Sequence, residues 1–295
     1  MGWHVFSGCD ALVSATLPSC ALPIRDSLGN VAGRLESVHI SEGSISIPSR
    51  AFAECVNLLS ISIPDSVERI GSKAFVDTAW WKSLGDGIVI KDGCCLGVRG
   101  DCPAEIELSD SVRLIARGAF SGCKSLCAIS LPNGIPAIEA ETFNNCSSLT
   151  NVNIPAGVKF IGDYAFDYCG SIAKIEIPEG VTNIGRCAFA ECSSLKSIHI
   201  PESVINIDYG AFEFCDDLEK VIIDEGVQYI GEYAFYKCTR LKEVTIPSKV
   251  TTLGKKVFSG CSSLKSITIK TKKGKVWTFK LSSKSKVSGK YDLEV

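Results

Sequence analysis

The sequence predicts an α/β-type repeat solenoid, in which short parallel β-strands and single helical turns alternate along the whole chain. Phenylalanine recurs at an unbroken step of 23 residues from Phe120 to Phe258. A cysteine follows each of these phenylalanines by three residues, and a leucine or isoleucine follows by six, as Cys192 and Leu195 follow Phe189. A fixed period of this length is typical of a repeat architecture. At this period, about twelve repeats of 22–23 residues fill the chain.

Each repeat contains the pattern of two short strands. Apolar and polar residues alternate over 195–200, so this segment predicts a strand with its apolar side chains turned inward. Pro201 ends that strand, because proline has no N–H group to donate to a neighbour. Val204 and Ile207 indicate a second extended stretch, and the segment up to the next phenylalanine predicts a helical turn. One repeat cannot bury its apolar face alone, so we expect the repeats to stack at about 4.8 Å.

The register is interrupted once, between Phe75 and Phe120, where the interval is 45 residues rather than 46. Within residues 75–97, clusters of turn-forming residues flank the apolar triplet 88–90. This arrangement predicts a local hairpin or bulged strand in an altered repeat. No linker divides the repeats, and we therefore expect one solenoid domain over residues 1–269.

The C-terminal residues 270–295 lose the repeat and form a predicted cap strand and tail. They carry eight lysines against two acidic residues, although the whole chain has a formal net charge of -2. Trp277 and Phe279 alternate with polar neighbours, which favours a terminal strand whose lysines deter edge-to-edge growth. Contact of this Lys-rich tail with anionic surfaces or polymers is the sharper alternative. The overall charge indicates no nucleic-acid partner, and no apolar stretch is long enough for membrane insertion.

The repeated motif Phe-x-x-Cys-x-x-Leu-x-x-Ile-x-Ile-Pro-x-x-Val-x-x-Ile-Gly resembles that of the BspA-like (Treponema pallidum-type) leucine-rich repeat family. The resemblance covers nearly the whole chain. It implies a leucine-rich-repeat right-handed superhelix with a parallel sheet on one face. It also implies a non-enzymatic protein-binding or cell-adhesion role, commonly at a cell surface or in a secreted protein. The first residues show no basic and apolar export signal, and the chain shows no anchor.

The chain contains 15 cysteines, an odd number that cannot all pair within it. Nine of them, from Cys9 to Cys261, fall in the repeat column, where small apolar side chains fill a tight inner corner. Cys94, Cys95 and Cys102 lie close together in the altered repeat but form no Cys-x-x-Cys pair. The sequence therefore predicts no metal site and no cofactor, and a thiol-dependent enzyme is a remote alternative.

Histidine is scarce, and its spacing argues against catalysis. His39 and His199 occupy equivalent strand positions seven repeats apart, or roughly 34 Å by strand spacing, so they cannot share a site. The chain contains no phosphate-binding loop, no His-Glu-x-x-His motif and no acidic calcium loop. We predict that the protein is not an enzyme and has no catalytic residues.

The exposed column of the first strands is the predicted binding surface, because a repeat array presents equivalent positions as one extended face. Its small and polar side chains suit hydrogen bonding to a protein or glycan partner. The candidate binding residues are His39, Ser62, Glu107, Asn153, Glu176, His199 and Thr245. The alternative is a structural spacer, or a fragment of a larger surface protein, whose sheet face is only solvated.

Aromatic residues at non-core positions of the later repeats form a second candidate surface. They are Phe160, Tyr164, Tyr168, Tyr209, Phe214, Tyr229, Tyr233 and Tyr236. Aromatic side chains are enriched at interface hot spots, but they also cover turns between repeats.

Overall fold

The computed structural model describes residues 12–17, 33–53, 55–271 and 274–280. The chain forms two compact units, which we call the N-terminal unit (Met1–Cys102 with Ser111–Ala119) and the C-terminal unit (Pro103–Asp110 with Phe120–Val295). The start of the predicted solenoid and most of the predicted cap and tail over 270–295 lie outside the described residues. Within the described ranges, no helix has the length and apolar character to cross a membrane.

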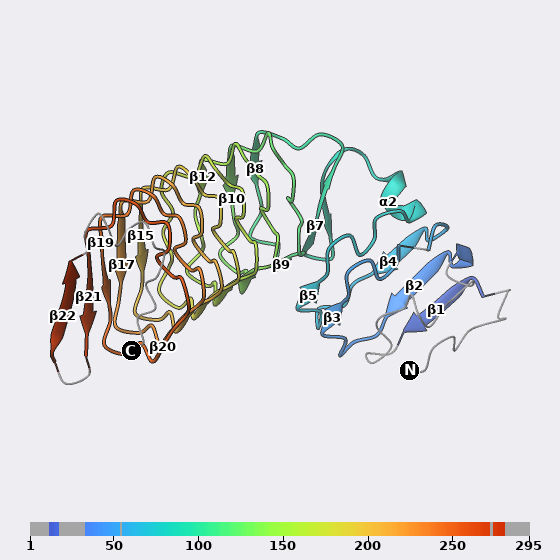
Figure 1. Cartoon of the computed structure of the whole chain (residues 1–295). Coiled ribbons are helices and arrows are strands. Elements are labelled where there is room, and N and C mark those ends of the chain that lie inside the picture. The colour runs from blue at the N-terminus through green and yellow to red at the C-terminus, as the bar shows by residue number, and fades with distance from the viewer. Residues whose placement is uncertain (1–11, 18–32, 54, 272–273, 281–295) are drawn as a thin grey trace. The chain divides into compact units, whose positions relative to one another are not determined.

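In the C-terminal unit, the first strands of successive repeats form parallel ladders, which we call the first-strand sheet (Figure 1). One ladder contains β8 (Glu105–Glu107), β10 (Ala128–Ser130) and β12 (Asn151–Val152). The other contains β15 (Ser197–Ile200), β17 (Lys220–Ile223), β19 (Glu243–Ile246), β21 (Ser266–Lys270) and the antiparallel strand β22 (Val276–Lys280). A parallel bridge from Lys174 to Ser197 marks the repeat between them. The strands pair in steps of 23 residues, as Ser197 does with Lys220, so the predicted register is confirmed.

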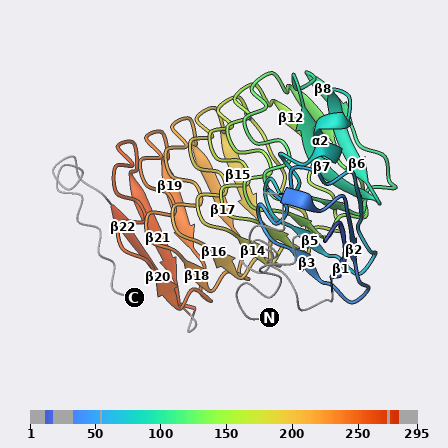
Figure 2. The ribbon, with the colours of Figure 1, turned by 90° about the vertical axis from the view of Figure 1, so that its right-hand side faces the viewer.

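The second extended stretches of these repeats form a separate six-stranded parallel sheet, the second-strand sheet. It contains β11 (Ala137–Ile138), β13 (Phe160–Ile161), β14 (Asn183–Ile184), β16 (Asn206–Ile207), β18 (Tyr229–Ile230) and β20 (Thr252–Leu253). Figure 2 shows β14, β16, β18 and β20 in one row and β15, β17, β19, β21 and β22 in another. The two rows enclose the apolar columns, which confirms a parallel β-solenoid with little helix.

The segments around the repeated phenylalanines are hydrogen-bonded turns, where the sequence predicts single helical turns. In the turns of the C-terminal unit from Phe143 to Phe258, two residues each have a left-handed backbone, such as Tyr164 (φ 57°) and Tyr168 (φ 58°) on either side of Phe166. A left-handed residue interrupts a right-handed helix. The amide groups of all three residues donate instead to carbonyl oxygens of the next repeat, at 2.7–3.0 Å. The turns therefore form a third ladder, which we call the turn face.

The core is a stack of phenylalanine rings beside a column of cysteines. From Phe120 to Phe258, neighbouring rings lie 5.2–5.8 Å apart and are nearly parallel. The cysteines are buried beside them, which confirms the packing column. From Cys146 to Cys261, each Sγ also donates to a phenylalanine carbonyl oxygen of a preceding repeat at 3.1–3.3 Å. These cysteines therefore satisfy buried acceptors as well as filling space.

The N-terminal unit contains the same two kinds of strand and the altered repeat. Its strands are β1 (Ser14–Leu17), β2 (Ser37–Ile40), β3 (Ser46–Ile47), β4 (Ser60–Ser62), β5 (Arg69–Ile70), β6 (Gly87–Lys91), β7 (Cys94–Arg99) and β9 (Leu114–Ile115), with the short helix α2 (Ala79–Ser83). Strands β6 and β7 are antiparallel, and their register shifts between Val89 and Ile90. Where the sequence predicts a local hairpin or a bulged strand, the structure has a hairpin that contains a bulge. Cys94 and Cys95 pair in parallel with β9 and are fully buried.

Candidate functional site

Three shallow grooves lie on the exposed face of the first strands. In the N-terminal unit, a groove of about 430 Å³ over β1, β2 and β4 includes His39 and Ser62. In the C-terminal unit, a groove of about 500 Å³ over β8, β10 and β12 includes Glu107 and Asn153. A groove of about 520 Å³ over β17, β19 and β21 includes Thr245. Five of the seven predicted binding residues therefore line one of these three grooves.

The two remaining predicted residues, Glu176 and His199, lie outside these grooves and are engaged by neighbours. The Lys174 ammonium donates to the exposed Glu176 carboxylate at 2.7 Å, and this hydrogen bond lowers the pKa of Glu176. His199 Nε2 lies 2.8 Å from Asp224 Oδ2. In the N-terminal unit, His39 Nδ1 lies 2.9 Å from Ser62 Oγ. Both strand histidines are therefore held by the repeat that follows them.

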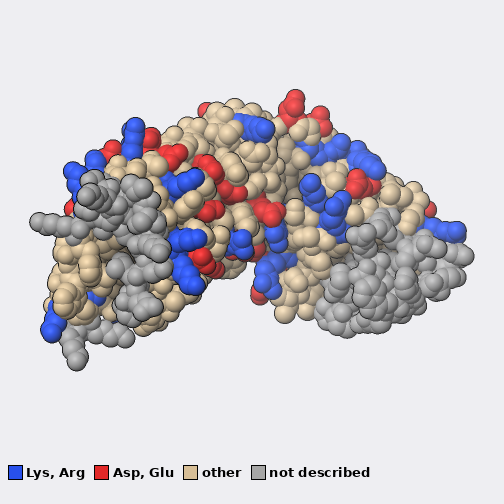
Figure 3. Space-filling model, viewed as in Figure 1, with Lys and Arg blue, Asp and Glu red and all other residues tan. Residues whose placement is uncertain are grey.

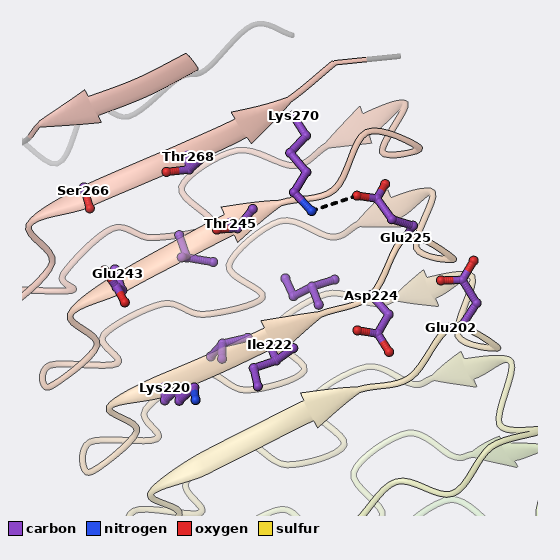
Figure 4. Close-up of a pocket in the computed structure, with 13 residues that line it drawn as sticks. Glu202, Lys220, Ile222, Asp224, Glu225, Glu243, Thr245, Ser266, Thr268 and Lys270 are labelled. Carbon is purple, nitrogen blue, oxygen red and sulfur yellow. Dashed lines mark hydrogen bonds and ion pairs between the residues drawn. The ribbon is translucent and has the colours of Figure 1, made fainter. Parts of the chain in front are cut away.

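The groove over β17, β19 and β21, here called the β17–β21 groove, contains three rows of side chains (Figure 4). The row at the strand starts is Lys220, Glu243 and Ser266. The middle row is Ile222, Thr245 and Thr268. The row at the strand ends includes Glu202, Asp224, Glu225 and Lys270. Charged groups thus border both sides of a centre that combines one apolar side chain with two hydroxyl groups.

Hydrogen bonds hold the charged border at the strand ends. The Ser248 amide and hydroxyl both donate to Glu225 Oε2 at 2.8 Å, and Lys270 Nζ donates to Glu225 Oε1 at 3.1 Å. Burial raises the pKa of Glu225, but these donors outweigh it and lower the pKa overall. Lys249 pairs with Glu202 at 3.1 Å. The Glu225 carboxylate in this border is therefore held by three hydrogen bonds.

Two departures from the repeat pattern meet in this groove. Ile222 is the one apolar residue in the exposed strand column of the described repeats, and 42% of its surface is exposed. Asp224 occupies the position held by Pro201 and Pro247 in the adjacent repeats, and it binds His199. Neither residue is among the binding residues that the sequence predicts. The signal that could have found them is that each differs in character from the residues at the same position in the adjacent repeats.

Three buried cysteines outside the repeat column are poor candidates for nucleophiles. Burial raises the pKa of Cys94 to about 11, and that of Cys95 and Cys187 to about 12. Because the thiolate is the reactive form, these thiols are weakly nucleophilic at neutral pH. Cys102 is partly buried, and no cysteine among the described residues forms a disulfide. Over the same described ranges, no three His, Cys, Asp or Glu side chains converge as metal ligands.

The chain is similar to solved leucine-rich repeat structures. One is a leucine-rich repeat protein from Bacteroides ovatus, at 24% identity over 92% of this chain and 75% of that one, with a TM-score of 0.39. Another is the leucine-rich repeat protein of T. pallidum, at 26% identity over 78% of each chain, with a TM-score of 0.42. A third is a leucine rich cell surface protein from Faecalibacterium prausnitzii, at 24% identity over 86% of this chain and 83% of that one, with a TM-score of 0.35.

A comparison with curated proteins gives no match. The family model of the BspA type leucine rich repeat region matches in six copies, over residues 1–83, 102–176 and 159–285. These matches span most of the chain, including the repeats that form the two sheets and the turn face. The chain therefore belongs to the BspA-type leucine-rich repeat family.

Proposed function

We propose that this protein is a non-catalytic interaction module that binds an extended segment of a partner protein in the β17–β21 groove. The observation that carries the proposal is the exposed Ile222 side chain, which stands between hydroxyl groups and charged borders in the groove. Removing exposed apolar area from water favours binding by roughly 25 cal/mol per Å². Thr245 and Thr268 can then donate to or accept from the backbone of the bound segment.

The charged borders supply selectivity for the partner's side chains. Lys220 pairs in register with Glu243 across β17 and β19, so both signs of charge are present at the strand starts. At the strand ends, Asp224 and Glu225 present carboxylates. Electrostatic complementarity of this kind sets orientation and suppresses wrong partners more than it adds affinity. A segment with an apolar residue flanked by a basic one fits this arrangement.

The hydrogen bonding of the groove supports the same role. Its floor is a parallel sheet, and its strand-end border contains the hydrogen bonds of Glu225 and the exposed ion pair of Glu202. A preformed site loses little conformational entropy when a ligand binds. At a cell surface, the location that the family resemblance implies, such binding would serve adhesion. A spacer function predicts instead that no ligand is selected at this groove.

The matched pair Ile222→Arg and Ile205→Arg tests the proposal. Ile205 is 41% exposed, almost the same as Ile222, but lies next to β16 in the second-strand sheet. We expect peptides selected from a displayed library on the wild-type protein to bind Ile222→Arg at least about tenfold more weakly. Ile205→Arg should bind them unchanged. Equal losses in both variants, or selection of glycans from an array but no peptides, would contradict the proposal.

A further inference from the structure

The last fifth of the sequence is strongly basic, whereas the rest of the sequence is acidic. Residues 237–295 contain fifteen Lys and Arg against three Asp and Glu, whereas the preceding residues contain sixteen against thirty. Figure 3 shows basic and acidic side chains interspersed over the face that it presents, so positive charge lies beside negative charge. An asymmetry of this size indicates attraction of an anionic partner to one end.

Part of this positive charge is neutralised by acidic residues of preceding repeats. The ion pairs are Arg240 with Asp217, Lys242 with Glu219, Lys249 with Glu202, and Lys270 with Glu225. Within the described part of the chain, Lys237, Lys255 and Lys256 form no ion pair, and all three are exposed. These three lysines belong to the turns around Phe235 and Phe258, so their charge is available on the turn face.

Aromatic rings hold two of these lysines in place. Lys256 Nζ donates to the Tyr233 hydroxyl at 3.0 Å and lies 5.3 Å from the centre of that ring. Lys237 Nζ lies 4.9 Å from the centre of the Phe214 ring and 5.4 Å from that of Tyr236. The rings of Tyr233 and Tyr236 meet edge to face at 5.2 Å, so they connect the two lysines. We call these five residues the lysine–tyrosine platform.

The backbone conformation of the turns leaves room for the side chains of this platform. Tyr233, Lys237 and Lys256 all have a left-handed backbone, with φ between 54° and 60°. Gly260, one repeat beyond Lys237, lacks a side chain where a Cβ would lie only 2.6 Å from Lys237 Cγ. The absence of that side chain leaves room for the Lys237 stem. Lysines are normally mobile, and holding them before binding reduces the entropy lost when a ligand is bound.

We propose that the lysine–tyrosine platform is a second binding site, which takes an anionic polysaccharide through its sulfate or carboxylate groups. The two held ammonium groups and the nearby Lys255 are point charges that suit such groups on successive sugars. Single-stranded nucleic acid binds by stacking bases on open aromatic faces. Here the Lys237 ammonium lies over the rings of Phe214 and Tyr236, and the Lys256 ammonium meets Tyr233 at its hydroxyl edge. The arrangement therefore favours a polysaccharide over a nucleic acid.

The acidic residues of the preceding turns limit the site on one side. Glu191 stands one repeat before Phe214 in the same turn column, close enough for the Lys237 charge to act on its carboxyl group. Glu213 lies in the neighbouring column, directly before Phe214. Carboxylates repel a polyanion, so the chain of the polysaccharide runs from Lys237 towards the C-terminal repeats. This site is distinct from the β17–β21 groove, which lies on the first-strand sheet.

Binding of heparin, a sulfated polysaccharide, to the whole chain tests the proposal. The double variant Lys237→Gln/Lys256→Gln should bind a defined heparin oligosaccharide at least about tenfold more weakly than the wild type. The matched control Lys242→Gln/Lys249→Gln removes the same charge from two ion-paired lysines and should change affinity less than about twofold. Tyr233→Phe keeps the ring but removes the hydroxyl group, and should weaken binding by a smaller factor.

Three outcomes would overturn the proposal. The first is absence of heparin binding by the wild type at low salt, and the second is an equal loss of affinity in both double variants. The third is that polyglutamate or oligothymidylate of matched charge binds as tightly as heparin, because the ligand would then be an acidic protein or a nucleic acid. Circular dichroism and the unfolding midpoint of each variant verify that the fold is intact. Ile222→Arg should leave heparin binding unchanged.

Discussion

Cys192 Sγ donates to the carbonyl oxygen of Phe166 at 3.3 Å, and so links two repeats through the middle of the core. The same oxygen also accepts the Cys169 amide within its own turn. Equivalent sulfur contacts recur along the column from Cys146 to Cys261. The cysteine side chain is small enough for the inner corner and still carries a donor, which alanine and valine lack.

Replacement of Cys192 by alanine should therefore destabilise the protein by about 1–3 kcal/mol, through lost contacts and a less satisfied acceptor. The free energy of unfolding in urea measures the effect. Cys127 is exposed, and Cys127→Ala is the control that should change stability little. A stability change at Cys192 no larger than that at Cys127 would show that the sulfur contacts add nothing.

Replacement of Phe189 by alanine should cost about 3–5 kcal/mol, because its buried ring stacks on Phe166 and Phe212 at 5.2 Å. The loss should be local at first, since each repeat contacts chiefly its neighbours. Hydrogen exchange should show reduced protection in the adjacent repeats before distant ones. Equal loss of protection in distant repeats of the C-terminal unit would contradict this nearest-neighbour behaviour.

Asp167 should make the protein less stable as the pH rises. It is buried, and burial followed by the nearby Glu191 and Glu213 carboxylates raises its pKa from 3.8 to about 7. The folded state therefore binds this proton more tightly than the unfolded state does. The contribution of Asp167 to the free energy of unfolding is fully present below pH 3.8 and is lost as the pH rises towards 7.

Asp167→Asn should remove this dependence and stabilise the protein at pH 8 by about 1–3 kcal/mol. The Asn144 amide, which donates to Asp167 Oδ2 at 3.1 Å, can still donate to the new side chain. Unfolding free energies measured between pH 4 and pH 8 test this expectation. Asp101→Asn, at an exposed position far along the chain from these turns, is the control that should leave the profile unchanged.

Alkylation should distinguish the cysteines by their surroundings. At pH 8, iodoacetamide should modify the exposed Cys127 rapidly, and the buried column should react only on unfolding. Cys94 and Cys95, whose pKa values burial raises to about 11 and about 12, should also react slowly. Mass spectrometry of timed samples identifies the modified residues. Fast reaction of any buried cysteine in the folded protein would revive the thiol-dependent alternative.

Much of the fold could be predicted from the spacing of particular residues. The step of 23 residues between successive phenylalanines places Ile198 beside Val221 in the first-strand sheet, as observed. The turns were predicted less well, because their left-handed residues, such as Tyr168 and Glu191, include types that seldom adopt this backbone. Hydrogen bonds to the next repeat stabilise that conformation, and a single repeat read alone contains no sign of them.

The candidate site was predicted in part. Thr245 follows from the exposed strand column, but its groove is defined by Ile222 and Asp224, which depart from the repeat. The lysine–tyrosine platform was foreseen only as a set of aromatic positions. Tyr233 and Lys256 are 23 residues apart and meet only because the turns of neighbouring repeats stack.

The sequence by itself determined the period, the inward columns and the register of both sheets, because periodic burial of apolar side chains allows only one stacking of such repeats. Only the tertiary structure decided the path of the turns, the β17–β21 groove and the lysine–tyrosine platform. Each of these depends on contacts between side chains or backbone groups of different repeats. Those contacts join residues of different repeats, so they become visible only when the repeats are stacked.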